Sequence, residues 1–391
     1  MFKRNVLAVS MTLAALCTAQ AAMADINGGG ATLPQPLYQT AGVLTAGFAQ
    51  YIGVGSGKGK LAFLNNDYSQ FGTGTKNVHW AGSDSKLNAN ELASYASNHG
   101  AAWGPLIQVP SVATSVAIPF NKAAVAPDPG VDLSVDQLCG VFSGRLTTWN
   151  QISNSGRTGA ITVVYRDEAS GTTELFTRFL NAKCTNEAAG KFAVTTNFAS
   201  SYPGGLPANA VAATTSQGVM NALNAGEGRI TYMSPDYAAS TLAGLDDATK
   251  VAKVAGVSPA PANVSAAIAA VDVPAAANRS NPNAWVPVFA AAANPDDPSV
   301  VVYPDSGYPI LGFTNLVFSQ CYADATQSTQ VRAFFTRHYG NLVNNDTAIN
   351  NNRFVPLPTN WKKAVRDTFL TASSGQSIGN TSVCNAIGRP L

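Results

Sequence analysis

The sequence predicts an α/β fold in two domains, and three observations support this. Beyond an N-terminal segment of 24 residues, about 367 residues remain, which is more than one hydrophobic core usually holds. Short β-branched runs alternate with segments of helical periodicity, as in α/β proteins. Two apolar stretches, Val109–Phe120 and Tyr303–Phe318, resemble strands that cross between domains. Two crossings imply that one domain is built from both ends of the chain.

Residues 1–24 have the layout of a secretory signal peptide. Two basic residues precede the apolar run Val6–Leu16, and the small residues Ala22 and Ala24 provide a cleavage site. The run is shorter than the roughly 20 residues that a membrane span needs. We therefore place the mature start at Asp25, and we expect a periplasmic or secreted protein without membrane insertion.

The strand and helix signals allow a provisional division of the mature chain. The strand Ile161–Tyr165 is followed by a polar loop and by the helical pattern of Thr173–Leu180. We place domain I at residues 25–113 and 312–391, and domain II at residues 114–311. The Ala/Pro-rich segment Ala238–Pro298 is interpreted as decoration on domain II. Further strands are expected at Leu106–Val109, Ser115–Ile118, Arg229–Met233 and Val300–Tyr303, and helices at Asn90–Ser97, Val135–Phe142, Val264–Val271 and Trp361–Leu370.

The charge balance argues against a nucleic-acid partner. Removing the two basic residues of the signal peptide leaves 22 Lys+Arg against 22 Asp+Glu, so the mature chain is formally neutral. A nucleic-acid-binding protein normally shows a basic excess or cluster. Charged residues make up 12% of the chain, against a typical value of about 25%, so uncharged polar residues must cover much of the surface.

The cysteine pattern indicates disulfides rather than a metal site. Cys139, Cys184, Cys321 and Cys384 remain after processing, and four cysteines allow three pairings. There is no CxxC motif and the chain has only three histidines, so no metal is expected. We favour the sequential pairing, in which each bridge closes a loop worth on the order of 4 kcal/mol of chain entropy.

The segment from Arg166 to Thr173 predicts an anion-binding site. It places a cation, two hydroxyls (Ser170 and Thr172) and Gly171 where a strand turns into a helix. Free backbone N–H groups and the positive end of the helix dipole favour an anion there, and Glu168 is expected to hold the guanidinium. Taken alone, the segment fits a helix cap and a surface ion pair equally well.

Three further polar clusters strengthen this prediction. Thr32 and Leu33 precede an expected helix, and Ser56 lies in the glycine-rich stretch Gly53–Gly59. That stretch lacks the spacing of a nucleotide-binding P-loop. Asp84 lies in a turn before a helix, where a carboxylate often serves as a cap. In an anion site, however, a buried carboxylate rejects any ion that brings no proton, so it admits hydrogen phosphate and excludes sulfate.

In this order the clusters resemble the phosphate-binding subunits of high-affinity phosphate transporters. The mature start Asp25-Ile26-Asn27-Gly28 is similar to that of the DING proteins of that superfamily. Further landmarks are Thr147–Asn150, Gly228–Tyr232 and Phe354–Pro358. The resemblance implies a two-lobed periplasmic binding protein fold of type II, with the ligand in the cleft between two domains joined by two hinge strands.

The resemblance also implies a ligand set and a partner. The expected ligand is inorganic phosphate, held by a monomer without cofactor, and the expected partner is the permease of a phosphate ABC transporter. Asp84 accepts the proton of the phosphate and Glu168 supports the arginine. The implied phosphate-binding residues are Thr32, Leu33, Ser56, Asp84, Arg166, Ser170, Gly171 and Thr172.

Two alternatives remain open. A free-standing extracellular phosphate scavenger or adhesion-type DING protein would share the same site without a transporter. A phosphate-ester hydrolase or serine esterase is the alternative from another class, because Gly375-Gln-Ser-Ile-Gly379 fits a nucleophile elbow. That motif follows an expected helix instead of a strand, and no histidine comes after it, so we expect no enzyme.

Overall fold

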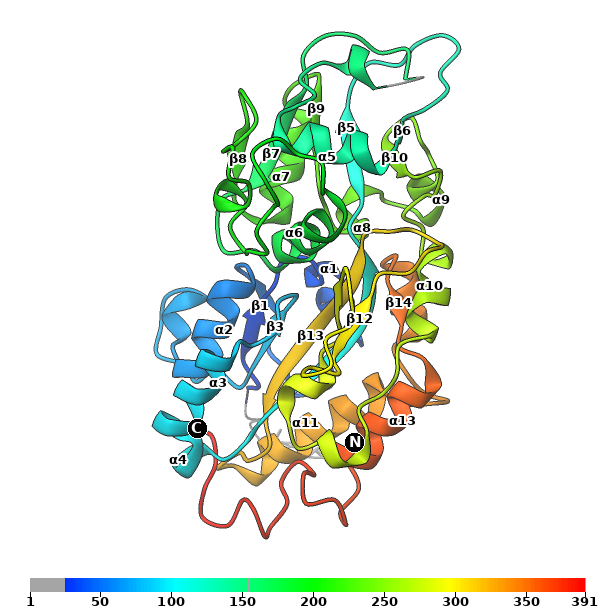
Figure 1. Ribbon diagram of the computed structural model, residues 1–391. Coiled ribbons are helices and arrows are strands. Elements are labelled where there is room, and N and C mark those ends of the chain that lie inside the picture. Colours follow the sequence, from blue (N-terminus) through cyan, green and yellow to red (C-terminus); the bar gives the residue numbers. More distant parts are fainter. Residues whose placement is uncertain (1–24, 153–154, 391) are drawn as a thin grey trace, which may run out of the picture.

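The computed structural model describes residues 25–152 and 155–390, so the predicted signal peptide lies outside the described residues. The chain folds into two α/β lobes, one above the other in Figure 1, and each lobe has a six-stranded sheet. The strand orders are β14-β4-β13-β3-β1-β2 and β6-β10-β5-β9-β7-β8. The predicted two-lobed architecture is confirmed.

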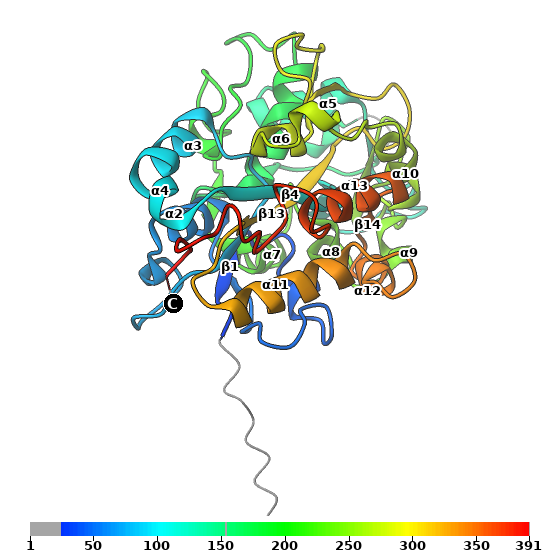
Figure 2. The same ribbon diagram turned by 90° about the horizontal axis from the view of Figure 1, so that it is seen from below.

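The first lobe is assembled from both ends of the chain, and Figure 2 shows it from below with α2, α3 and α4 on one side and α13 on the other. Its strands are β1 (Gly28–Gly30), β2 (Ile52–Gly53), β3 (Trp80–Ser83), β4 (Leu106–Ser115), β13 (Leu311–Ser319) and β14 (Val355–Pro356). Its helices are α1 (Gln35–Gln39), α2 (Ser56–Asn65), α3 (Ala89–Tyr95), α4 (Ala101–Trp103), α11 (Ala325–His338), α12 (Asp346–Asn351) and α13 (Thr359–Phe369).

The second lobe is the middle of the chain. Its strands are β5 (Ile118–Asn121), β6 (Asp132–Leu133), β7 (Thr162–Arg166), β8 (Val211–Ala213), β9 (Arg229–Thr231) and β10 (Val251–Val254). Its helices are α5 (Val135–Ser143), α6 (Gly171–Lys183), α7 (Thr215–Asn224), α8 (Pro235–Ala238) and α9 (Leu242–Leu245). Local sequence sets these ends: Ser134 and Gln137 form a capping box on α5, and Gly144 ends the helix in the left-handed region.

The direction of the strands decides where functional side chains can meet. In the first sheet β1 pairs in parallel with β2 and β3, and in the second sheet β7 pairs in parallel with β8 and β9. Parallel strands end at the same edge of a sheet, and ligands bind outside the carboxyl ends of such strands. The polar residues after β1, β2, β3, β7 and β8 therefore gather at two sheet edges.

The chain crosses between the lobes twice. The first crossing is the two-residue step between β4 and β5, where Ala117 and Met233 exchange backbone hydrogen bonds of 2.7 and 2.8 Å. The second was expected within Tyr303–Phe318, but β13 pairs with β3 and β4 and belongs entirely to the first sheet. The return instead occurs between β10 and α10 (Ala262–Ala269), where Ser115 Oγ donates to the carbonyl of Pro259 at 2.8 Å.

The Ala/Pro-rich segment also differs from the expectation that it decorates the second domain. Its α10 and the short strands β11 (Val288–Ala290) and β12 (Val300–Val302) form an insertion that packs mainly against the first lobe. Trp361 on α13 donates from Nε1 to the carbonyl of Val271 at 2.8 Å, and the rings of Trp285 and Trp361 lie 6.3 Å apart. Tyr303 then reaches Phe179 of α6, with ring centroids 5.6 Å apart, so the segment contacts both lobes.

Two disulfides reinforce the lobes in the pairing that the sequence analysis favoured. Cys139–Cys184 joins α5 to the end of α6, with Cα atoms 5.5 Å apart. Cys321–Cys384 fastens the C-terminal loops to the end of β13, with Cα atoms 5.2 Å apart. Within the described residues, no helix has the length and hydropathy required to cross a membrane.

Candidate anion-binding site between the lobes

The first lobe contributes three polar residues from the ends of its parallel strands. Thr32 follows β1, Ser56 is the first residue of α2 after β2, and Asp84 follows β3 directly. All three are almost fully buried. Ser56 Oγ accepts a hydrogen bond from the backbone N–H of Asp84 at 3.1 Å, which ties the second strand end to the third. The side chain of Leu33 belongs to the core, so only its backbone is available to a ligand.

The second lobe contributes the segment that the sequence analysis singled out. Arg166 is the last residue of β7, and Ser170 caps α6 by accepting from the backbone N–H of Thr173 at 3.2 Å. Gly171 and Thr172 form the first turn of that helix. The strand, polar loop and helix therefore follow in the predicted order, with the N-terminus of α6 beside a buried guanidinium.

Glu168 holds the guanidinium of Arg166 from one side. Its Oε1 accepts from Arg166 Nε at 2.8 Å and from the backbone N–H of Thr215 at 2.8 Å. The backbone N–H of Arg166 donates to Tyr232 Oη at 3.2 Å. The guanidinium is thus fixed in position by an acidic partner, the supporting role expected for Glu168.

The two lobes touch each other through the same residues. Thr32 Oγ1 lies 2.9 Å from Ser216 Oγ and accepts from the backbone N–H of Ser216 at 3.1 Å. Thr172 Oγ1 donates to Asp84 Oδ2 at 3.2 Å. A Cβ added to Gly171 would lie 2.4 Å from Ser56 Oγ and 2.6 Å from Asp84 Cβ, so only glycine permits this approach. The lobes are therefore closed on one another around these side chains.

Asp84 is the only proposed ligand residue with a carboxylate, and its surroundings set its proton affinity. Burial raises the pKa of Asp84 to about 6, while Thr314, Arg166 and Thr172 oppose that rise. The carboxyl is therefore mostly ionised at neutral pH but costs free energy to keep buried. A ligand that donates a proton to it relieves that cost, whereas a ligand without a proton adds repulsion.

Several neighbours of the site escaped the sequence analysis. Ser216 and Thr215 open α7 directly after β8, which repeats the strand, polar loop and helix order of the Arg166 segment and was therefore detectable. Tyr232, which supports Arg166, was noted only as part of the landmark Gly228–Tyr232. Thr314 lies inside the apolar strand β13, where no local pattern marks a polar residue as functional.

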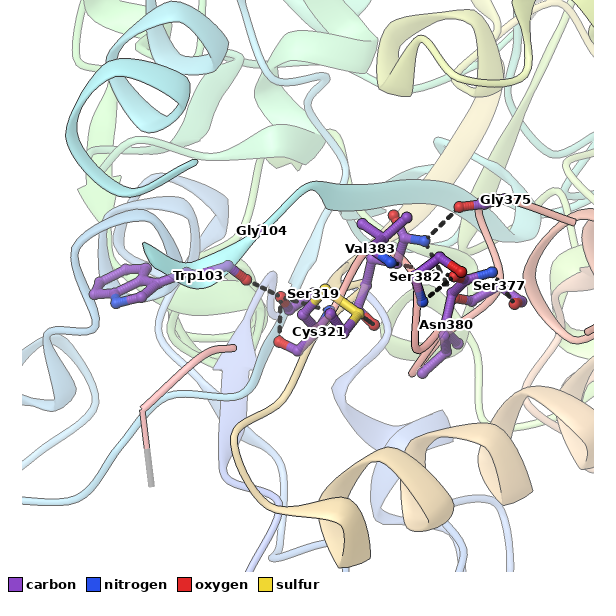
Figure 3. Close-up of a disulfide and its surroundings, with 12 residues drawn as sticks. Trp103, Gly104, Ser319, Cys321, Gly375, Ser377, Asn380, Ser382 and Val383 are labelled. Atoms are coloured by element: carbon purple, nitrogen blue, oxygen red, sulfur yellow. Dashed lines mark hydrogen bonds between the residues drawn. A yellow bond between two sulfur atoms is a disulfide. The ribbon is translucent and has the colours of Figure 1, made fainter. Parts of the chain in front are cut away.

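The nucleophile-elbow motif lies in the C-terminal loops, away from the strand end that such a motif requires. Ser377 lies among the C-terminal loops beside the disulfide of Cys321, as Figure 3 shows. Its Oγ accepts from Asn380 Nδ2 at 3.5 Å, and its carbonyl accepts from Gln320 Nε2 at 3.2 Å. Among the described residues no hydrogen bond joins Ser377 to a histidine, and no group of three or more His, Cys, Asp or Glu side chains is placed to hold a metal ion.

With this geometry established, comparison with known proteins gives a clear result. A family model described as the PBP superfamily domain matches residues 18–335. The chain belongs to the PBP superfamily. The predicted resemblance is thereby confirmed at the level of the family.

Three similar proteins show which members of the PBP superfamily this chain resembles. It is 71% identical to a Pseudomonas aeruginosa (strain UCBPP-PA14) protein named alkaline phosphatase L, with 100% of both chains covered. It is 68% identical to a phosphate-binding protein from an unknown prokaryotic organism, covering 94% of this chain and 100% of the other. A solved structure of PfluDING, a high-affinity periplasmic phosphate-binding protein with bound phosphate, superposes with a TM-score of 0.91 at 71% identity over 94% and 100% of the two chains.

Proposed function

We propose that this chain binds one hydrogen phosphate ion between its lobes and releases it unchanged. The observation that carries the proposal is the position of Asp84 opposite Arg166 and the first turn of α6. A guanidinium and free helix N–H groups attract a dianion, while a buried carboxylate accepts only an ion that still bears a proton. Hydrogen phosphate meets both requirements at neutral pH.

The proposed ligand set is the one expected from the sequence. Thr32 and Ser56 supply hydroxyls from the first lobe, Leu33 and Gly171 supply backbone N–H groups, and Asp84 accepts the proton of the ligand. Ser170, Thr172 and Arg166 enclose the ion from the second lobe. The relative PfluDING, 71% identical over its whole chain, was solved with phosphate bound, which supports this assignment.

Titration calorimetry with a panel of oxyanions tests the proposal. We expect phosphate to bind and sulfate to show negligible heat at pH 8, where Asp84 is ionised. Asp84→Asn should weaken phosphate binding and allow sulfate to bind, because the amide donates a hydrogen bond that the carboxylate lacks. Equal affinities of the wild-type protein for the two anions would overturn the proposal.

The proposed biological role rests on the resemblance to the phosphate-binding subunits of transporters. We propose that the protein acts in the periplasm or outside the cell as a monomer, and that it delivers phosphate to the permease of an ABC transporter. The signal-peptide pattern and the two disulfides support export. Deleting the protein should slow phosphate uptake at limiting phosphate. Normal uptake, together with accumulation of the protein in the medium, would favour the free scavenger.

A phosphatase is the second candidate, because the relative at 71% identity is named alkaline phosphatase L. The geometry favours binding alone. The residues of the proposed site are buried. Asp84 would accept a proton from the ligand, and in a phosphate ester an organic group can replace that proton. Incubation with an aryl phosphate decides: we expect no turnover above background. Turnover that Arg166→Met abolishes would establish catalysis in the cage and contradict pure binding.

A further inference from the structure

Strand β13 runs beside β3, the strand that ends directly before Asp84. It pairs antiparallel with β3, and Asn315 is the partner of Ser83 in the register. Thr314 precedes Asn315 and Asp84 follows Ser83, and the side chain of Thr314 lies close enough to Asp84 to lower the pKa of its carboxyl. Asn315 Nδ2 donates to the carbonyl of Ser83 at 3.1 Å, which fixes the backbone that carries Asp84.

Thr314 and Asp84 each have an unmet hydrogen-bonding requirement at this point. Thr314 is fully buried, and its Oγ1 has no hydrogen-bond partner within the part of the chain that the structure describes. Asp84 Oδ2 accepts from Thr172, whereas Asp84 Oδ1 is buried and likewise lacks a partner among the described residues. Thr314 nevertheless lies near enough to Asp84 to lower the pKa of its carboxyl, so a buried hydroxyl lies beside a buried carboxylate oxygen, and buried polar groups are rarely left unpaired.

The charged groups around Asp84 come from several elements. Arg166 at the end of β7 favours its ionised form, and Glu174 on α6 opposes it. Lys86 and Arg178 join Glu174 in lining a small cavity of about 10 Å³ that also reaches Asp84 and Asn315. In the core of the first lobe, burial and the negative charge of Asp84 raise the pKa values of Tyr38 and Tyr51, so both tyrosines remain neutral. From β13, the side chain of Thr314 lowers the pKa of Asp84 by hydrogen bonding.

We infer that Thr314 is a specificity-determining positioning residue, whose hydroxyl donates to Asp84 and keeps it as a proton acceptor for the ligand. The inference rests on the proposed phosphate site and deepens it. A charge-assisted hydrogen bond favours the carboxylate over the neutral acid. Without the hydroxyl, Asp84 takes up a proton at higher pH and becomes a donor, and the site then no longer distinguishes an anion with a proton from one without.

Sulfate is the suitable probe of this state because it carries no proton at any pH between 4 and 9. Phosphate itself titrates near neutrality, so its own pH profile mixes two protonations. Sulfate binding therefore reports the protonation of Asp84 alone. In the wild-type protein, sulfate binding should appear only as the pH falls through about 6, the pKa of Asp84.

The experiment measures sulfate and phosphate affinity by calorimetry from pH 5 to 8.5 in wild type, Thr314→Val and Thr314→Ser. Valine matches the shape of threonine without the hydroxyl, and serine keeps the hydroxyl. The valine variant should shift the midpoint of sulfate binding upward by about one pH unit, a tenfold change in proton affinity. The serine variant should keep the wild-type midpoint.

A merely structural role for Thr314 would weaken both anions without moving the sulfate midpoint, and that result would overturn the inference. If the valine variant does not fold, Thr314→Ala replaces it. The wild type alone also tests the inference, since failure of sulfate to bind at pH 5 would contradict it. A wild-type protein that does not bind phosphate at any pH would instead refute the proposed function itself.

Discussion

Two buried arginines, Arg166 and Arg389, have contrasting surroundings. Arg166 is held by the carboxylate of Glu168 and lies at the interface between the lobes. Among residues 25–152 and 155–390, no carboxylate pairs with Arg389: its Nε donates to the carbonyl of Val78 at 2.6 Å, a second bond reaches the carbonyl of Phe63, and its guanidinium lies 3.8 Å from the ring centroid of Phe63.

The difference shows how the surroundings of a buried cation set its role. Burial lowers the pKa of Arg389 to about 10, so the side chain is still charged at neutral pH. Its guanidinium interacts with carbonyl oxygens and aromatic faces of the first lobe. Arg166 pairs with the carboxylate of Glu168, and we propose that its guanidinium also binds the ligand. Arg389 therefore supports the fold, whereas the proposed role of Arg166 is in ligand binding.

Arg166→Met should produce the largest effect and sharpen this contrast. Phosphate affinity is expected to fall about a thousandfold, roughly 4 kcal/mol, because a buried dianion loses its charge-assisted donors. Calorimetry measures the loss, and thermal unfolding without ligand should stay close to that of the wild type. Arg389→Met is the matched control, with the same change of charge; an equal loss of affinity in both variants would abolish the distinction.

The second largest effect is expected from removing the disulfide Cys321–Cys384, which anchors the C-terminal loops that lead to Arg389. Replacing both Cys321 and Cys384 by Ser frees a loop of 63 residues, which is worth on the order of 4 kcal/mol of unfolding free energy. Denaturant titration measures this change, and phosphate affinity should be unaffected. The double Ser replacement at Cys139 and Cys184 is the comparison in the other lobe. A large loss of phosphate affinity in the Cys321 and Cys384 variant would show that the tail also shapes the ligand site.

Arg389→Met should destabilise the protein by about 2 kcal/mol, since the two carbonyls it satisfies lose a buried donor. Equilibrium unfolding in urea provides the measurement. Phosphate affinity should remain within about twofold of the wild type. Arg389→Lys separates charge from shape, because lysine keeps the cation and lacks the planar fork. An unchanged unfolding free energy in the Met variant would show that the cost of burying the charge equals the free energy gained from its hydrogen bonds.

The smallest effect is expected for Ser216→Ala, which removes one hydroxyl from the contact between the lobes. Its Oγ lies 2.9 Å from Thr32 Oγ1. Loss of this single hydrogen bond should weaken phosphate binding about fivefold, equivalent to about 1 kcal/mol. The dissociation rate from stopped-flow fluorescence measures the change. Gln217→Ala, on the adjacent and exposed position of α7, is the control and should behave like the wild type.

The parts of the candidate site that could be predicted from the sequence are those marked by a local pattern of residues. Arg166, Ser170 and Gly171 combine a strand end, a capping hydroxyl and a glycine within six residues, and this order is visible without a structure. The start of α2 was less visible, because the stretch Gly53–Gly59 is rich in glycine and no helix was expected there. A Cβ on Gly59 would lie 2.5 Å from the Cα of Gly30, so packing of the helix on β1 requires glycine there despite its low helix propensity.

Other features depend on pairing that the sequence does not reveal. The role inferred for Thr314 follows from its position beside Asp84 in the folded chain, and a single threonine in an apolar strand carries no sign of it. The insertion was assigned to the second domain by its place in the chain, yet Trp285 and Trp361 meet across a long sequence separation and attach it to the first lobe. Burial of large aromatic surfaces decided that placement.

Gly171 gives the interface between the lobes one further property. Its hydrogen atom occupies the place where any other residue would push a carbon against Ser56 and Asp84. The distance of closest approach of the lobes is therefore set by the smallest side chain available. How long a captured ion stays enclosed depends on how completely water is kept from its oxygens. We therefore expect the residence time of the proposed ligand to depend on the absence of a methyl group at Gly171.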